Sequence, residues 1–75
     1  MIEIYDTNNQ KIECEILFTF EKNNKSFIVY KDKEEDILAS YYTKDKDNII
    51  IEPILDDNDY SIVDEELEKW WKDYE

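Results

Sequence analysis

The sequence contains no glycine, no histidine and no arginine, and it has one cysteine and one proline. Without histidine, it lacks the side chain that most often serves as a general base or transition-metal ligand near neutral pH. Without glycine it has no glycine-rich phosphate loop, and without arginine it lacks the usual bidentate ligand of phosphate groups. We therefore expect no enzymatic activity, no cofactor and no metal site.

The single cysteine, Cys14, excludes an intramolecular disulfide, although a secreted domain of this size usually needs several. No apolar run approaches the roughly 18 residues of a membrane-spanning helix. The first residues show neither the basic nor the apolar region of a signal peptide. These features predict a cytoplasmic protein, in which Cys14 is a buried, unreactive thiol on the apolar side of a strand.

Acidic residues outnumber lysines by 21 to nine, which gives a net charge of −12. This charge repels phosphate backbones and anionic lipid surfaces, so we expect neither direct nucleic-acid binding nor membrane binding. A basic protein is the partner that the charge favours. The apolar fraction of 41% is sufficient for one core, and the length of 75 residues predicts a single domain over residues 1–75.

Hydrophobic periodicity divides this domain into a sheet over residues 1–54 and a helix over residues 58–74. Apolar residues recur at every second position in the first part and follow a helical period in the second. The pattern predicts an α+β fold, with a four- to five-stranded antiparallel meander and one C-terminal helix packed on one face. Strands are expected at residues 2–5, 12–21, 26–30, 37–43 and 49–52.

Two hairpins fix the expected register. A three-residue loop with Asn9 in the left-handed region keeps apolar residues of the first two strands on one face. A two-residue turn at residues 23–24 sets Phe20 opposite Phe27 and Leu17 opposite Tyr30. The second strand then has one apolar face, formed by Ile12, Cys14, Ile16, Phe18 and Phe20.

The terminal helix has one apolar stripe. Its members are Tyr60, Val63, Leu67, Trp70, Trp71 and Tyr74. Asp57, Asn58 or Asp59 is the expected N-cap, because short acidic and amide side chains accept hydrogen bonds from the first free N–H groups of a helix.

Five residues are candidates for a partner surface. Trp70 and Trp71 point about 100° apart on a helix, so one ring should be partly exposed, either as the edge of the stripe or as an anchor for a partner. Leu17, Ile28 and Tyr30 should share the sheet face that the helix leaves uncovered. That face is either a minor cluster beneath lysine side chains or a surface for a partner or a weak homodimer.

The abundant carboxylates are better explained as a solvated surface than as catalytic groups, because acid catalysis needs one acid in an apolar pocket. Five residues have the offsets of a calcium loop: Asp57, Asp59, Ser61, Glu65 and Glu68. The position that requires glycine is Ile62, so a helix cap followed by an acidic first turn explains them better.

The order of elements also resembles a known family. The second strand reads Ile16-Leu17-Phe18-Thr19-Phe20-Glu21, the third Ser26-Phe27-Ile28-Val29-Tyr30, and Glu52-Pro53-Ile54 precedes an acidic helix. These segments resemble the YrzB-like family of small acidic proteins from low-GC Gram-positive bacteria. The chain departs from it in having Asn8-Asn9 where an Asp-Gly turn is usual, and in lacking arginine in the fourth strand. The resemblance implies a bacterial cytosolic protein and supplies no mechanism, because the family is itself a domain of unknown function.

Two functions remain open from the sequence. The first is a non-enzymatic interaction or regulatory domain that binds a basic partner through its acidic surface and an aromatic anchor. The second is an acidic mimic that occupies the nucleic-acid groove of another protein. The chain itself is expected to be a monomer or a weak homodimer.

Overall fold

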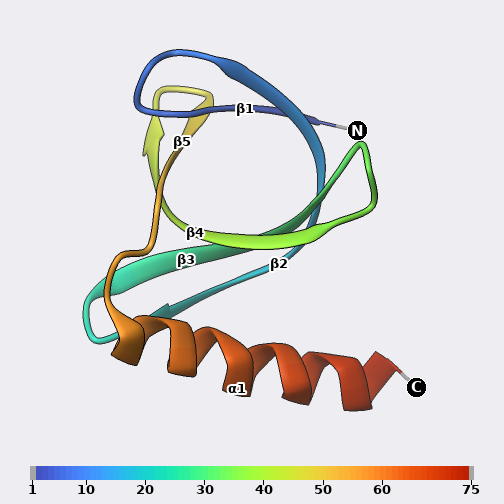
Figure 1. Cartoon of the computed structure of the whole chain (residues 1–75). Coiled ribbons are helices and arrows are strands. Elements are labelled where there is room, and N and C mark those ends of the chain that lie inside the picture. The colour runs from blue at the N-terminus through green and yellow to red at the C-terminus, as the bar shows by residue number, and fades with distance from the viewer. Residues whose placement is uncertain (1, 75) are drawn as a thin grey trace.

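The computed structural model describes residues 2–74, with side chains described for residues 2–72. Five strands precede one helix. The elements are β1 (Ile2–Tyr5), β2 (Lys11–Lys22), β3 (Lys25–Asp32), β4 (Ile37–Asp45), β5 (Asn48–Glu52) and α1 (Asp57–Tyr74). Consecutive strands pair antiparallel, and α1 lies along the outside of the sheet (Figure 1), which confirms the predicted α+β fold. Within the described residues, no helix is long and apolar enough to cross a membrane.

The loops after β1 and β3 are built alike around an aspartate. Oδ1 of Asp6 accepts hydrogen bonds from the N–H groups two and four residues ahead, and Oδ1 of Asp32 does the same. The residue three positions ahead is left-handed in both loops: Asn9 has φ 63° and Glu35 has φ 67°. The predicted first loop and its register are confirmed. The aspartates stabilise these loops through side-chain hydrogen bonds, while Asn9 and Glu35 adopt the left-handed conformation that glycine often provides.

The β2–β3 hairpin has the predicted two-residue turn. Asn23 and Asn24 have φ angles of 54° and 63°, and both belong to the residue type that tolerates the left-handed region best after glycine. Lys22 lies opposite Lys25, and the predicted pairing of Phe20 with Phe27 is confirmed.

A β-bulge at Leu17 changes which side of β2 is apolar. Ile16, and not Leu17, lies opposite Tyr30, so the predicted pairing of Leu17 with Tyr30 is wrong. The extra residue bends the strand and interrupts its alternation. Ile16 packs in the barrel interior, whereas Leu17 and Phe18 pack in the layer beneath α1. The single apolar face predicted for residues 12–20 is therefore two faces of one bent strand.

The sheet closes into a barrel because β1 also pairs with β5, in parallel, through Tyr5 and Ile50. In Figure 1 the strands surround the barrel interior as a ring. The buried side chains that fill it are Ile4, Cys14, Ile28, Tyr30 and Ile51. Burial raises the pKa of the Cys14 thiol, and the prediction that this cysteine is buried is confirmed.

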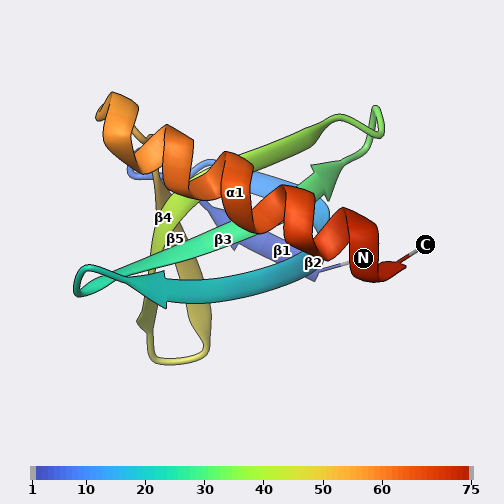
Figure 2. The same cartoon turned by 90° about the horizontal axis from the view of Figure 1, so that it is seen from below.

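A second core lies between α1 and the outer face of the barrel. Figure 2 shows α1 running obliquely across the sheet on this side. The buried side chains of this layer are Phe27, Val29, Ile54 and Val63. Consecutive residues of β3 are therefore buried on alternate faces, one covered by the barrel interior and the other by the helix.

Asp56 caps α1. Its Oδ1 accepts a hydrogen bond from the Asn58 N–H at 2.8 Å, and its carbonyl accepts one from the Tyr60 N–H at 3.1 Å. The predicted cap at Asp57, Asn58 or Asp59 is therefore wrong, because the helix begins one residue earlier than expected. Asp57 and Asp59 lie in the first turn, where the helix dipole favours carboxylates.

The buried stripe of α1 differs from the predicted stripe at both ends. Val63 is buried as expected, but Tyr60 is 48% exposed and Trp71 is 51% exposed. Asp59, one residue before Tyr60, is buried instead. The predicted stripe also included Tyr74, whose side chain lies outside the described residues.

Candidate functional site

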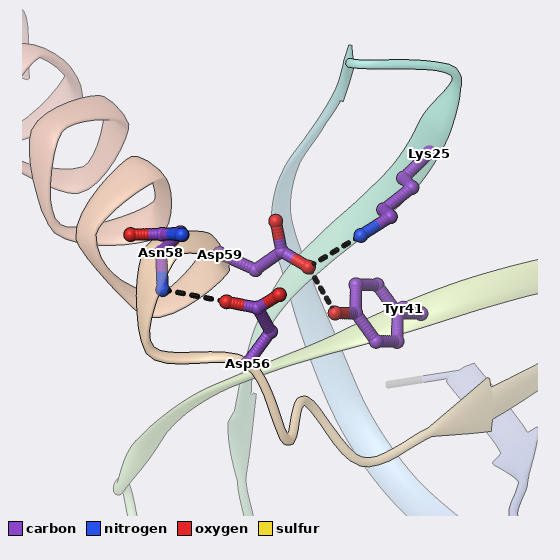
Figure 3. A network of polar contacts seen from close by, with 5 residues as sticks. All are labelled: Lys25, Tyr41, Asp56, Asn58 and Asp59. Carbon is purple, nitrogen blue, oxygen red and sulfur yellow. Dashed lines mark hydrogen bonds and ion pairs between the residues drawn. The ribbon is translucent and has the colours of Figure 1, made fainter.

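The N-terminal end of α1 is held to the barrel by three polar side chains. Asp59 Oδ2 accepts hydrogen bonds from the Lys25 ammonium, at 2.8 Å, and from the Tyr41 hydroxyl (Figure 3). Lys25 begins β3 and Tyr41 lies in β4, so one carboxylate joins the helix to two strands. The Lys25 Nζ also lies 5.6 Å from the centroid of the Tyr41 ring. We call Lys25, Tyr41 and Asp59 the clamp.

The clamp favours the protonation state that each group already has at neutral pH. The hydrogen bonds from Lys25 and Tyr41 lower the pKa of the Asp59 carboxyl. The hydrogen bond to Asp59 raises the pKa of the Lys25 ammonium and, with burial, that of the Tyr41 hydroxyl. A protonated lysine, a protonated tyrosine and an ionised aspartate offer neither a general base of high pKa nor an activated nucleophile. The clamp therefore has the chemistry of a structural contact.

A hollow of about 360 Å³ lies beside the clamp. Its lining includes Lys25, Tyr41, Tyr42, Thr43 and Glu52. The one cationic group in this lining, Lys25, is paired with Asp59, and Glu52 adds a negative charge. An anionic ligand would therefore meet a neutralised lysine and an unfavourable field.

The C-terminal end of α1 is held by aromatic rings instead. Trp70 stacks on Phe18 of β2, with ring centroids 5.6 Å apart and an angle of 23° between the planes. Trp71 is tilted against Trp70, with 5.9 Å between the centroids, and about half of its surface is exposed. One ring of the pair thus packs on the sheet while the other is partly exposed, as predicted.

Two adjoining hollows of about 600 and about 570 Å³ share Ile37 and Trp71 in their linings. We call them together the Trp71 groove. Its apolar lining residues are Ile16, Leu17, Ile37, Leu67, Trp70 and Trp71. Ile37 is the first residue of β4 and is 40% exposed, and the next residue, Leu38, is 41% exposed. Successive strand residues point to opposite faces of a sheet, so Ile37 lies with Trp71 in the groove and Leu38 points to the other face. Exposed apolar side chains that adjoin in one groove, such as Ile37 and Trp71, are typical of a contact surface.

The rim of the Trp71 groove is acidic. Its charged residues are Glu15, Lys31, Glu35, Asp64, Glu68 and Lys72. Both lysines are in ion pairs with carboxylates of the same rim, Lys31 with Glu15 at 3.6 Å and Lys72 with Glu68 at 3.5 Å. Among the described residues, Glu35 and Asp64 are in no ion pair, so the rim has a net negative charge.

The structure separates the five predicted partner-surface residues into two groups. Leu17, Trp70 and Trp71 line the Trp71 groove. Ile28 and Tyr30 are 0% and 4% exposed and lie in the barrel interior. The prediction that Leu17, Ile28 and Tyr30 share an uncovered sheet face is wrong. The closed sheet buries Ile28 and Tyr30 in its interior, and the bulge turns Leu17 toward the layer beneath α1.

The acidic residues considered for calcium lie on α1 rather than in a loop. A continuous helix directs side chains at these offsets around its axis, not toward one ion. A separate group, Asp32, Glu34 and Asp36, brings carboxylate oxygens within 4.8 Å of one another in the loop after β3. Asp32 already accepts two backbone hydrogen bonds there, so the requirements of the turn account for its position.

Sequence reasoning missed two residues of these sites. The sequence pattern predicts Asp59 only as a helix cap or calcium ligand, whereas it binds a lysine 34 residues away, and no local pattern signals that contact. For Ile37 the sequence pattern predicts only a place in a strand. Its signal is an apolar residue directly after the charged run at residues 31–36, at the exposed start of β4.

Comparisons with known proteins place the chain beside proteins whose function is not established. A family model described as a protein of unknown function (DUF1292) matches residues 7–72. The chain is 37% identical over 76 residues to a UPF0473 protein of Bacillus pumilus, covering 88% of this chain and 80% of the relative. It is also 37% identical over 82 residues to the UPF0473 protein YrzB of Bacillus subtilis, covering 96% and 88%. These matches confirm the resemblance seen in the sequence. No solved structure matches the chain.

Proposed function

The chain belongs to the DUF1292 family of proteins of unknown function, and from that premise we propose that it is a non-enzymatic binding protein for a basic protein partner. The Trp71 groove is the contact site in this proposal. The partner inserts apolar side chains beside Trp71 and Ile37, and its lysine or arginine residues approach the acidic rim.

The observation that carries the proposal is the exposure of Trp71 and Ile37 together, in one groove, on a protein of net charge −12. Exposed tryptophan contributes more binding energy at interfaces than most residue types, because it buries a large area at low entropic cost. The surrounding negative field attracts cationic surfaces over roughly one Debye length, about 8 Å at physiological salt. Together these features favour a basic partner that also offers apolar side chains.

The clamp supports a role in binding rather than catalysis. Its three groups are held in their ordinary charge states, and the hollow beside it has no unpaired cation. The cytoplasmic location expected from the sequence remains a prediction, and it is consistent with a partner among basic intracellular proteins.

Capture from a bacterial lysate on immobilised protein, at about 0.1 M and about 1 M salt, tests the proposal, because the Debye length falls from about 10 Å to about 3 Å between them. Basic proteins should be retained at low salt and released at high salt. Trp71→Ala should bind the retained proteins at least about tenfold more weakly than the wild type does, a factor that corresponds to about 1.4 kcal/mol.

Tyr60→Ala is the matched control. Tyr60 is an exposed aromatic residue of the same helix, at the opposite end from the groove. Its replacement should leave retention unchanged. Equal retention by wild type and Trp71→Ala, or retention that persists at high salt, would contradict the proposal. Displacement of the captured protein by added DNA or RNA would instead favour the nucleic-acid mimic.

A further inference from the structure

The start of β4 is an open edge of the barrel. β3 pairs with β4 from Ile37 to Tyr41, whereas β5 pairs with β4 only from Tyr41 to Asp45. Residues 37–40 therefore have a strand on one side and, among the described residues, none on the other. An open edge presents unpaired N–H and C=O groups and can template pairing with another chain.

The alternation of the ladder identifies which backbone groups point outward. A two-residue hairpin turn joins a hydrogen-bonded pair, and successive residues then point to opposite sides of the strand. Counting from the pair Lys22–Lys25, Ile28 and Tyr30 direct their backbone groups toward β4. Their partners in β4, Ser40 and Leu38, direct theirs toward β3.

Ile37 and Ala39 consequently direct their N–H and C=O groups away from β3. The β4–β5 turn gives the same result independently, because Asp45 pairs with Asn48 across it and Tyr41 then points toward β5. Ile37 and Ala39 are each an even number of residues from Tyr41, so their backbone groups point to the same side of the strand as those of Tyr41. Neither has a backbone or side-chain hydrogen bond outside the strand ladders to another described residue.

This edge adjoins the Trp71 groove. Ile37 belongs to both, and its side chain lines the groove together with Leu67 and Trp71. A strand added at the edge would extend the sheet face that α1 covers. Side chains on that face of the added strand would lie beside Asp64 and Glu68, which line the same groove.

The negative charge of the protein decides which kind of chain segment can pair with this edge. A second copy of the chain carries the same net charge of −12 and a similarly acidic rim, so edge-to-edge pairing of two copies is opposed by repulsion. A lysine-rich extended segment places cations beside the rim carboxylates and also supplies the strand hydrogen bonds. Main-chain bonds of this kind give affinity, and alternate side chains give specificity.

We propose that the partner binds by adding an extended, basic segment as a strand to residues 37–40 of β4, with alternate side chains in the Trp71 groove. This inference rests on the proposed function and specifies how the partner binds. The edge residues that carry it are Ile37 and Ala39, through their backbone groups.

An acetylated, amidated decapeptide of alternating Lys and Val tests the inference with the intact protein. Amide hydrogen exchange at Ile37 and Ala39 should slow at least about tenfold in the bound state, because their N–H groups gain acceptors. Exchange at Leu38 and Ser40 should change little, since their N–H groups already bond to β3.

A peptide N-methylated at every residue removes both edges and should bind at least tenfold more weakly than the parent. The variant Ala39→Pro removes one outward N–H group and should weaken binding of the parent peptide by a similar factor. Leu38→Pro, by contrast, removes a bond to β3 and should destabilise the fold itself. Because Ala39→Pro could also disturb the strand, the exchange pattern in the wild-type protein remains the deciding measurement.

Several results would overturn the inference. They are absence of peptide binding, uniform protection along β4, full binding by the fully methylated peptide, and protection of Thr19 and Glu21 on the outer edge of β2 instead. Each of these leaves the proposed function intact if salt-sensitive capture still depends on Trp71. Loss of that dependence, with peptide binding at the edge retained, would instead contradict the proposed function.

Discussion

The two ends of α1 are attached to the barrel by opposite chemistry. At the N-terminal end, Asp59 is 3% exposed and its carboxylate is bound by Lys25 and Tyr41. At the C-terminal end, Trp70 stacks on the sheet while Trp71 leaves half its surface exposed beside an acidic rim. A polar end whose groups are mutually satisfied suits attachment, whereas an apolar end that stays partly exposed suits recognition.

Phe27→Ala should have the largest effect on stability, because it removes a fully buried ring from the layer beneath α1. Phe27 is fully buried, stacks on Phe20 with centroids 4.7 Å apart, and lies 5.4 Å from the Tyr41 ring of the clamp. Truncation of a buried phenylalanine costs about 3–5 kcal/mol, a large part of the stability of a domain this small. Urea denaturation should show a variant that is largely unfolded. A loss below about 1 kcal/mol would mean that the layer beneath α1 is not a tight core.

Trp70→Ala should have the next largest effect, and it should act mainly at the C-terminal end. Trp70 is partly exposed, so its truncation should cost roughly 2 kcal/mol, about half the loss for a fully buried tryptophan. Amide exchange should accelerate more in the last two turns of α1 than in the first. Equal acceleration at both ends would show that the helix opens as one unit and would remove the contrast between them.

Asp59→Asn should weaken the N-terminal end in a way that depends on pH. Because the clamp lowers the pKa of Asp59 from 3.8, its contribution to stability is present above about pH 3.8 and is lost as pH falls through the folded-state pKa. The variant should therefore be less stable than the wild type at pH 7, and the difference should shrink at acidic pH. Urea denaturation at several pH values measures this difference.

Asp57→Asn is the control for the clamp. Asp57 also lies in the first turn, so its replacement removes the same charge from the same helix end without touching Lys25 or Tyr41. Comparing the two variants separates the clamp from the general repulsion among 21 acidic residues, which also changes as pH falls. The same pH dependence in both variants would contradict a specific role for Asp59.

Trp71→Ala should have the smallest effect on stability. Its ring is 51% exposed and tilts against Trp70 rather than packing into the sheet, so the free energy of unfolding should change by about 0.5 kcal/mol or less. Thermal denaturation measures it. A loss close to that of Trp70→Ala would mean that the groove is part of the core, and the distinction between the two rings would fail.

Local pattern was sufficient for most of the fold. Alternation and turn chemistry predicted the strands, the left-handed Asn9 and the pairing of Phe20 with Phe27, because each depends on residues close together in sequence. The bulge at Leu17 had a signal in three consecutive apolar residues, Ile16-Leu17-Phe18. A pairing without a bulge, however, also set apolar side chains opposite each other on both faces of the hairpin, so the alternation alone did not reveal the bulge.

Features that depend on distant segments were not predictable in this way. Closure of the barrel requires β1 to meet β5 through Tyr5 and Ile50, and this closure is what buries Ile28 and Tyr30. The clamp likewise joins residues that no local period relates. The predicted exposed ring of the tryptophan pair could be anticipated from helix geometry, but the groove beside it could not, because Ile37 reaches Trp71 only in the folded chain.

The most direct test of the central claim measures how much basic protein each of two variants, Asp59→Asn and Trp71→Ala, captures at low salt and releases at high salt. The two variants are compared under conditions where both are folded. The contrast between the two ends predicts that Asp59→Asn retains basic proteins as the wild type does, although it is the less stable variant. Trp71→Ala should lose retention at least about tenfold while keeping wild-type stability. Loss of retention in Asp59→Asn, with retention unchanged in Trp71→Ala, would contradict the account.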